Sequence, residues 1–313
     1  MKRLFPLPLA LVVLAGCTPN QSSGEATSLL EARRGFTTTL VPQRRAKEPA
    51  EPAPPKIFRT ISYPAPAGNM AAYLSPDPGD GKKHPAIIWI TGGDCNSIGD
   101  VWSPAPRRND QTAAAYRKAG IVMMFPSLRG GNANPGTKEG FLGEVDDVLA
   151  AAEFLARQPY VDTNRIYLGG HSTGGTLALL VAEASNRFRA VFAYGPVADV
   201  SGYGEDSGFL PFDLHNRQEV RLRSPGYWLA PIQSPVWVIE GTQQSNISSL
   251  RAMARKSTNP KAHFIEIKGA DHFTDLAPTN ELIAKRILQD TAETSNLSIS
   301  TDDANQNFAK ESR

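Results

Sequence analysis

Between residues 57 and 290 the chain alternates short apolar runs with longer stretches in which apolar residues recur every three or four positions. The short runs predict eight strands, which are Ile57–Tyr63, Met70–Leu74, Ala86–Thr91, Ile121–Phe125, Arg165–Gly169, Ala190–Tyr194, Val236–Glu240 and His263–Ile267. The longer stretches predict four helices, which are Phe141–Arg157, Thr173–Ala184, Asn246–Lys256 and Pro278–Gln289. This alternation predicts an α/β fold with a mostly parallel eight-stranded sheet and helices on both faces. Residues 201–234 interrupt the rhythm, and we expect an insertion or lid region there.

The first residues have the pattern of a signal peptide. Lys2 and Arg3 precede the apolar run 4–14, which is too short to cross a hydrocarbon core about 30 Å thick. The run is followed by the sequence LAGC, which ends at Cys17 and resembles the lipobox of bacterial lipoproteins. That resemblance implies a signal peptide at 1–16, a lipidated Cys17 and attachment to the membrane of the bacterial cell envelope. The alternative is an ordinary secretory signal cleaved at the same place.

The two ends of the mature chain differ from the middle. Thr18 follows the cysteine where an Asp would favour retention at the inner membrane, so the resemblance favours the outer membrane. Residues 17–56 are rich in proline and lack a sustained apolar period, which predicts a disordered tether to a single domain at 57–290. Residues 291–313 are polar, and we expect a disordered tail. Cys95 is then the one cysteine inside the domain, so no internal disulfide is expected.

The composition limits the classes of function. The chain has 313 residues, of which 41% are hydrophobic and 20% are charged, as is typical of globular proteins. The 33 basic residues nearly balance the 31 acidic ones, so the basic excess that nucleic-acid binding requires is missing. The C-x-x-C and H-E-x-x-H patterns and the phosphate-binding P-loop are also missing, so neither a metal nor a cofactor is predicted. The sequence does not indicate an oligomeric state.

The strongest chemical signal is the sequence GHSTG at 170–174. It follows a predicted strand and opens a predicted helix, which is the setting of a G-x-S-x-G nucleophile elbow and predicts Ser172 as a nucleophile. A serine hydroxyl needs a base at neutral pH. His272 lies in the loop between the last predicted strand and the last predicted helix, after the serine in chain order, and is the predicted base. His171 lies inside the elbow and is expected to point away from the face of the serine.

From about Gly68 to Gln289 the chain resembles the α/β-hydrolases, and among them the prolyl oligopeptidase-like serine hydrolases. The landmarks, in chain order, are PAIIWITGG at 85–93, PSLRGG at 126–131, DDVLAAAE at 146–153, YVDTNRI at 160–166, the elbow, SP at 224–225, the strand 235–241 and DH at 271–272. The resemblance implies an α/β-hydrolase fold and an acyl-enzyme formed from a small ester or a short peptide. It also implies an oxyanion hole made by the backbone N–H of Thr173 and one N–H near Gly93.

The chain departs from this family at the residue that should orient the histidine. The family has an Asp three residues after the glycine that ends the strand 236–240, and Gln244 occupies that position here. Glu240, beside the same loop, is one alternative acid. Asp199, which follows the preceding strand, is another. The third alternative is a Ser–His dyad with a neutral partner such as Gln244 or Asn246.

Two hypotheses of function follow. The first is a serine hydrolase that cleaves an ester or short-peptide bond while tethered to the envelope. The second is a catalytically weak or inactive lipoprotein that uses the hydrolase fold as a binding scaffold. The missing Asp favours the second hypothesis, whereas the retained Ser172, His272 and elbow glycines favour the first. The loops 94–108 and 201–234 are expected to shape the substrate pocket, and neither carries a readable specificity motif.

Overall fold

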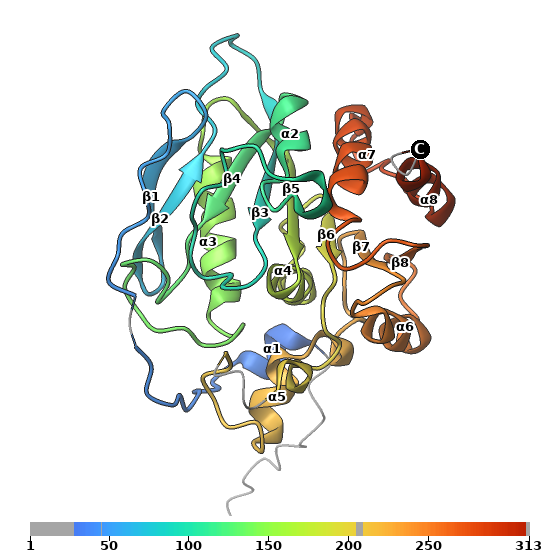
Figure 1. Cartoon of the computed structure of the whole chain (residues 1–313). Helices are drawn as coiled ribbons and strands as arrows, with labels where there is room; N and C mark the ends of the chain where they lie inside the picture. Colours follow the sequence, from blue (N-terminus) through green and yellow to red (C-terminus); the bar gives the residue numbers. More distant parts are fainter. Residues whose placement is uncertain (1–27, 45, 205–208, 311–313) are drawn as a thin grey trace, which may run out of the picture.

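The computed structural model describes residues 28–310 except 45 and 205–208. The expected signal peptide and Cys17 lie outside the described residues. The sheet contains β1 (Arg59–Ala65), β2 (Gly68–Leu74), β3 (His84–Ile90), β4 (Val122–Pro126), β5 (Val161–His171), β6 (Val191–Tyr194), β7 (Val236–Gly241) and β8 (Ala262–Ile267). Its strand order is β1-β2-β4-β3-β5-β6-β7-β8 (Figure 1). β1 and β2 form antiparallel pairs and the other strands pair in parallel, which confirms the predicted sheet.

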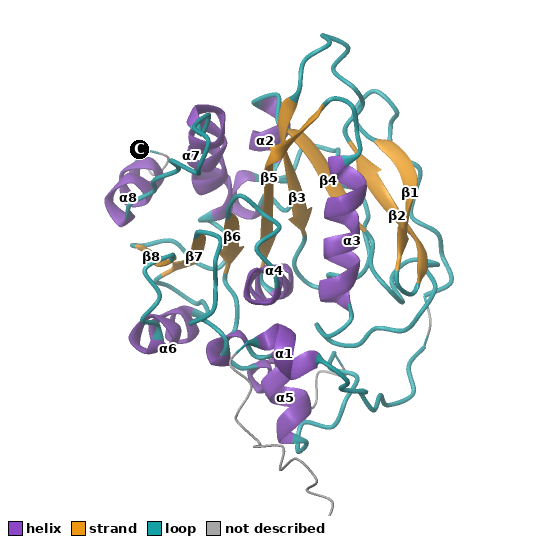
Figure 2. Cartoon of the chain, turned by 180° about the vertical axis from the view of Figure 1, so that it is seen from behind, coloured by secondary structure: helices purple, strands orange, loops and turns teal. Residues whose placement is uncertain are grey.

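Helices cover both faces of the sheet, as predicted. α3 (Glu144–Ala156), α4 (Thr173–Ala184) and α6 (Ile247–Lys256) contribute to the core on one face, and α2 (Ala114–Lys118), α7 (Leu276–Gln289) and α8 (Thr301–Ala309) contribute to the core on the other (Figures 1 and 2). Along β3, Ile88 and Ile90 enter the first core while Ile87 and Trp89 enter the second, because successive strand side chains point to opposite faces. α3 begins three residues later than predicted, since Phe141 has a φ of +79° that a right-handed helix cannot accommodate.

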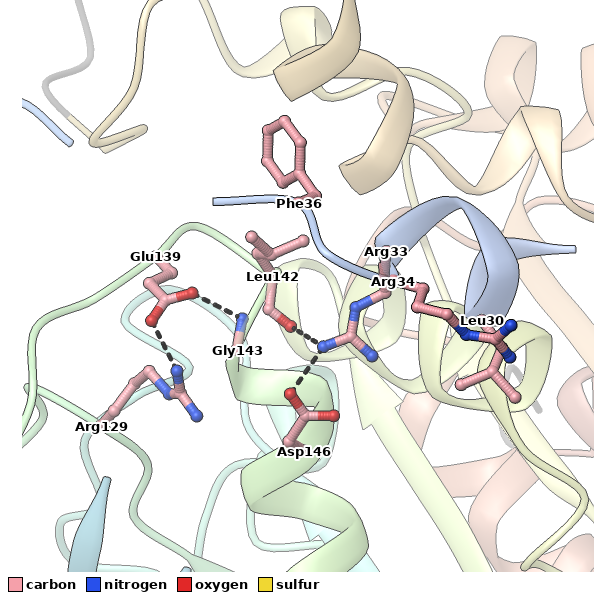
Figure 3. Close-up of a pocket in the computed structure, with 9 residues that line it drawn as sticks. All are labelled: Leu30, Arg33, Arg34, Phe36, Arg129, Glu139, Leu142, Gly143 and Asp146. Atoms are coloured by element: carbon pink, nitrogen blue, oxygen red, sulfur yellow. Dashed lines mark hydrogen bonds and ion pairs between the residues drawn. The ribbon is translucent and has the colours of Figure 1, made fainter. Parts of the chain in front are cut away.

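Residues 28–44, a described part of the expected tether, are folded against the domain, which corrects that expectation for this segment. Residues 28–44, which we call the strap, open with helix α1 (Leu29–Arg33), in which Leu29 is fully buried. The Arg33 guanidinium donates to the Leu142 carbonyl at 2.9 Å and pairs with Asp146 at 2.7 Å, near the start of α3 (Figure 3). A cavity of about 340 Å³ lies between this part of the strap and α3. Its three arginines include Arg33 and Arg129, and both of these are paired with carboxylates.

The strap then crosses the region expected to be an insertion. The Thr38 hydroxyl and the Thr39 N–H donate to the carboxylate of Glu219, which lies in α5 (Arg217–Arg223). The Val41 N–H donates to the Pro211 carbonyl at 2.8 Å. α1 and α5 therefore lie side by side beyond one end of the sheet (Figures 1 and 2).

The expected disordered tail is also ordered over most of its length. Residues 301–309 form α8, in which Ala304 is buried and the Asn305 amide donates to the Glu266 carbonyl at 3.0 Å. Just before the tail, Asp290 forms an ion pair with Arg189 at 2.7 Å. Arg189 also donates to the Ala292 carbonyl at 2.6 Å, so this cluster fixes the chain as it leaves α7. Across the ranges that the structure describes, no helix has the length and apolar character needed to cross a bilayer.

Candidate active site

Ser172 stands on a strained turn between β5 and α4. Its φ of +56° and ψ of −116° are rare for a residue with a side chain, and such strain persists only where the surroundings enforce it. The Ser172 N–H donates to the Tyr194 carbonyl at 2.8 Å, which joins the turn to the end of β6. The sequence-predicted elbow therefore has the backbone geometry expected of a nucleophile.

His272 and Glu240 form a hydrogen-bonded pair at the neighbouring strand ends. The Nδ1 of His272 lies 3.1 Å from Oε2 of Glu240, and the Glu240 side chain is 1% exposed. A carboxylate can only accept, so Nδ1 carries the proton and Nε2 of the neutral imidazole is left as the basic nitrogen. Gly195, after β6, makes room for this pair, because a Cβ there would lie 2.4 Å from His272 Cε1 and 2.7 Å from Glu240 Oε2.

The other candidates for the acid have different surroundings. Asp199 accepts hydrogen bonds from the N–H of Ser201 at 2.9 Å and from its hydroxyl at 2.6 Å, so it caps a short 3₁₀ turn. Gln244 is exposed. The Asn246 amide donates to the Gly195 carbonyl at 2.9 Å. Of these four candidates, the structure brings Glu240 to the His272 ring.

The two residues expected at the oxyanion hole lie together. Gly93 has a φ of +75° in the loop after β3, and its carbonyl accepts a 2.8 Å hydrogen bond from the Thr173 hydroxyl. Thr173 is the first residue of α4, and the first N–H groups of a helix have no partner within that helix. Its N–H is therefore available for a developing negative charge.

The cysteine near this loop is not reactive. Cys95 is buried two residues after Gly93, and burial raises the pKa of its thiol, so the thiol stays protonated at neutral pH. Within the described part of the chain, no group of three His, Cys, Asp or Glu side chains is arranged to hold a metal ion.

A cavity of about 390 Å³ begins beside the oxyanion loop. Two loops and the strap enclose it, and its lining residues are Val41, Pro42, Gln43, Arg44, Asp94, Cys95, Asn96, Lys138, Gly140, Phe141, Phe209 and Pro211. Among them, the rings of Phe141 and Phe209 pack together with 5.8 Å between their centroids, and Lys138 pairs with Asp94 at 2.7 Å. The strap thus contributes part of the wall of a cavity next to the candidate site.

Sequence reasoning missed two residues at this site. Gln111 gave no signal, because it lies in a turn without a motif. His171 was noticed only as a member of the elbow, and the structure shows its ring packed against that of His272, with 4.6 Å between the ring centroids. Gln111 hydrogen-bonds to the ring of His171.

Comparison with known proteins finds similar peptidases. The model of the Prolyl oligopeptidase family matches residues 108–243. The chain is 28% identical over 211 residues to dipeptidyl-peptidase 5 of Porphyromonas gingivalis, a match that covers 60% of this chain and 30% of that protein. It is 26% identical over 220 residues to the uncharacterized peptidase YtmA of Bacillus subtilis, with 67% of this chain and 80% of that protein covered.

Solved structures share the fold at low sequence identity. A puromycin hydrolase matches with a TM-score of 0.61 and 16% identity over 80% of this chain and 42% of that one. An esterase of Pyrobaculum calidifontis matches with a TM-score of 0.52 and 17% identity, over 74% of this chain and 85% of that one. The segment that matches the family model contains both the elbow of Ser172 and the strand β7, which carries Glu240. Over residues 108–243 the chain is therefore similar to the prolyl oligopeptidase family, and it has the α/β-hydrolase fold.

Proposed function

We propose that this protein cleaves an ester or short-peptide bond through an acyl-enzyme on Ser172. The observation that carries the proposal is the 3.1 Å contact between buried Glu240 and Nδ1 of His272, beside a serine held on a strained elbow. Nε2 of His272 accepts the serine proton while Oγ of Ser172 attacks the carbonyl carbon. The N–H groups of Thr173 and Gly93 stabilise the oxygen that becomes negative.

The second half of the reaction uses the same groups. His272 returns its proton to the leaving alcohol or amine as the bond from the carbonyl carbon to that group breaks. A water molecule then gives a proton to His272 and attacks the acyl carbon. As the bond from that carbon to Oγ breaks, His272 returns the proton to Oγ, which releases the acid and restores the Ser172 hydroxyl. Glu240 stabilises the imidazolium that exists during both steps.

The choice between a hydrolase and a binding scaffold depended on Gln244, which replaces the family's Asp. Glu240 supplies a carboxylate from a different backbone position, so the substitution at 244 does not leave the histidine without an acid. This favours the hydrolase.

Labelling with a fluorophosphonate tests the proposal directly. The wild-type protein should be modified at Ser172, and Ser172→Ala should lose both the labelling and the turnover of short aryl esters. A fully folded wild-type protein that neither labels nor turns over esters would support the scaffold hypothesis. Equal labelling of Ser172→Ala would show that another residue reacts.

The substrate group beside the scissile bond is proposed to occupy the 390 Å³ cavity next to Gly93. Phe141 and Phe209 line this cavity, which favours acyl or amide groups with an apolar side chain. A panel of aryl esters and of aminoacyl and prolyl amides measures this preference. Phe209→Ala should raise KM for substrates with bulky apolar groups more than for acetyl esters.

We also propose that a lipid on Cys17 holds the enzyme at the bacterial envelope, at the outer membrane. The lipobox-like sequence before Cys17 supports this. Only residues 18–27 separate Cys17 from the strap, and ten residues span at most about 35 Å. The greatest distance between the hydrolase and the membrane would therefore be shorter than a tether formed by all of residues 18–56 would give. Cys17→Ser should move the protein from the membrane fraction to the soluble fraction and remove the lipid from its N-terminal peptide by mass spectrometry.

A further inference from the structure

A chain of hydrogen bonds runs from the oxyanion loop to the loop of the catalytic histidine. The Gly92 N–H donates to Oε1 of Gln111 at 3.1 Å. Nε2 of Gln111 lies 2.7 Å from Nδ1 of His171, and Nε2 of His171 lies 2.7 Å from the carbonyl oxygen of His272. Three segments that are distant in sequence, the loop after β3, the end of β5 and the loop after β8, are thus joined by two side chains.

The direction of every bond in this chain is determined. Gln111 must present its oxygen to the Gly92 N–H, so its amide nitrogen faces His171. An amide nitrogen only donates, which makes Nδ1 of His171 an acceptor. The neutral imidazole then carries its proton on Nε2, where it donates to the His272 carbonyl. One tautomer of His171 satisfies all three bonds.

The surroundings keep His171 in that neutral form. Its side chain is almost completely buried, and burial, followed by the neighbouring His272, lowers the pKa of His171 to about 3. The ring also lies 5.4 Å from that of Phe273, which follows His272. His171 therefore contacts the loop of His272 both by ring packing and by a hydrogen bond.

The residues of this hydrogen-bond chain also lie close to Ser172. A Cβ on Gly92 would lie 2.9 Å from Nδ1 of His171 and 3.2 Å from Cβ of Ser172, so the oxyanion loop approaches both residues closely. His171 directly precedes Ser172, and both stand at the end of the central strand β5. The end of β5 thus supplies both the nucleophile and His171. The His171 side chain links the oxyanion loop, through Gln111, to the His272 loop.

We propose that Gln111 and His171 are positioning residues, which hold the oxyanion loop and the His272 loop in their positions relative to Ser172. Gln111 acts through the Gly92 backbone and through His171, and His171 acts through the backbone carbonyl and the ring of His272. The proposal rests on the proposed function, in which His272 is the base. A misplacement of about 1 Å in a catalytic group can lower the rate about 100-fold, so loss of the chain should lower kcat more than it changes KM.

The test uses the full chain with p-nitrophenyl acetate as substrate and a fluorophosphonate as the probe of Ser172. Gln111→Met and His171→Phe remove the hydrogen bonds while keeping approximate side-chain volume. Each should lower kcat and the labelling rate roughly 10- to 100-fold with KM changed less than threefold. The double variant should be no slower than the slower single variant, since both residues belong to one chain.

Two further variants separate positioning from general stability. His171→Gln restores a donor toward the His272 carbonyl and should recover about tenfold of the kcat lost in His171→Phe. Asn109→Ala removes the other partner of the Gln111 amide, which lies 2.9 Å away and outside the chain, and should leave kcat within twofold of wild type.

The outcomes are distinguishable. Wild-type kcat in Gln111→Met, or additive losses in the double variant, would overturn the proposal while leaving a Ser172-dependent hydrolase intact. If His171→Phe does not fold, the comparison of kcat between Gln111→Met and its control Asn109→Ala still tests the proposal. Gln111 is a half-buried loop residue, so its replacement should leave the fold intact. If Ser172→Ala keeps the wild-type activity, the proposed function fails, and the positioning proposal fails with it.

Discussion

The candidate active site and the two ends of the described chain are assembled in different ways. At the site, Ser172, Glu240 and His272 come from the end of β5, the end of β7 and the loop after β8, so the parallel sheet places all three at its carboxyl edge. The strap and the tail have no such scaffold. Single polar and charged side chains, such as Arg33 and Arg189, attach them to elements far away in the sequence.

The difference shows what each region depends on. The site requires a few atoms in a defined arrangement, so a change there should affect the rate of reaction more than the free energy of unfolding. The strap and tail depend on buried ion pairs, so a change there should lower the free energy of unfolding while the folded enzyme stays active. Four variants test this separation, and they are described in order of decreasing effect.

Glu240→Gln should have the largest effect. The amide cannot stabilise the His272 imidazolium, and a comparable replacement of the acid in serine proteases lowers kcat by about 10⁴, or roughly 5.5 kcal/mol of barrier. Steady-state kinetics on an aryl ester, together with the fluorophosphonate labelling rate, measure the loss. Glu266→Gln is the matched control, because Glu266 on β8 forms an exposed ion pair with Arg251 of α6. A Glu240→Gln enzyme within tenfold of wild type would show that another group orients His272.

Arg223→Ala should have the largest effect on stability. Arg223 is fully buried, pairs with Glu219, donates to the Thr38 hydroxyl at 2.8 Å and stacks over Phe212 at 4.1 Å. Its removal leaves the Glu219 charge buried without its partner, which costs about 3–5 kcal/mol. Denaturant unfolding measures this loss.

Activity distinguishes the two regions in this variant. At a temperature where Arg223→Ala is fully folded, kcat for an acetyl ester should stay within threefold of wild type. A loss of kcat comparable to that of Glu240→Gln would show that the strap and the active site are one functional unit.

The sequence predicted the site better than the terminal segments for a physical reason. The strand ends were predictable because a buried parallel strand such as β7 is apolar from Val236 to Ile239, and the elbow has its own glycine pattern. Glu240 was left as one of several alternatives, since the residue that reaches His272 depends on the cleft beside Gly195. Gln111 was missed because a single hydrogen bond across 60 residues leaves no trace in sequence periodicity.

The terminal segments were mispredicted for a related reason. Thr38 and Arg33 are polar residues in a proline-containing stretch, and composition alone assigns such a stretch to a flexible linker. Their partners, Glu219 and Asp146, lie more than 100 residues away. Order in these segments comes from contacts with the rest of the fold, which a local pattern does not encode.

Asp290→Asn should have an intermediate effect that depends on pH. Although burial works against it, hydrogen bonds from Arg189 and Tyr167 lower the pKa of Asp290 to about 2, below its ordinary value of 3.8. The carboxylate therefore stabilises the folded state above about pH 4, and this contribution disappears as the pH falls toward 2. Asp290→Asn should lower the free energy of unfolding by about 1–2 kcal/mol at pH 7.

The difference between wild type and Asp290→Asn should shrink as the pH falls from 4 toward 2, as measured by denaturant unfolding at several pH values. Asp146→Asn is the control, because Asp146 forms a half-exposed ion pair with Arg33 that contributes at most about 1 kcal/mol. A difference between wild type and Asp290→Asn that stays constant from pH 7 to 2 would mean that the carboxylate charge does not stabilise the tail.

Asp199→Asn should have the smallest effect of all, although Asp199 follows β6 on the same side of the sheet as the active site. Its Oδ1 accepts from Ser201, and an Asn side chain presents an oxygen in the same position, so the cap on the short turn is kept. We expect kcat within threefold of wild type and an unchanged midpoint of denaturation. A loss above tenfold would place Asp199 in the catalytic machinery and would remove the distinction between a residue near the strand ends and a residue that contacts His272. An unchanged rate, beside the loss in Glu240→Gln, would show that contact with the imidazole, rather than position at this edge of the sheet, decides which carboxylate serves the reaction.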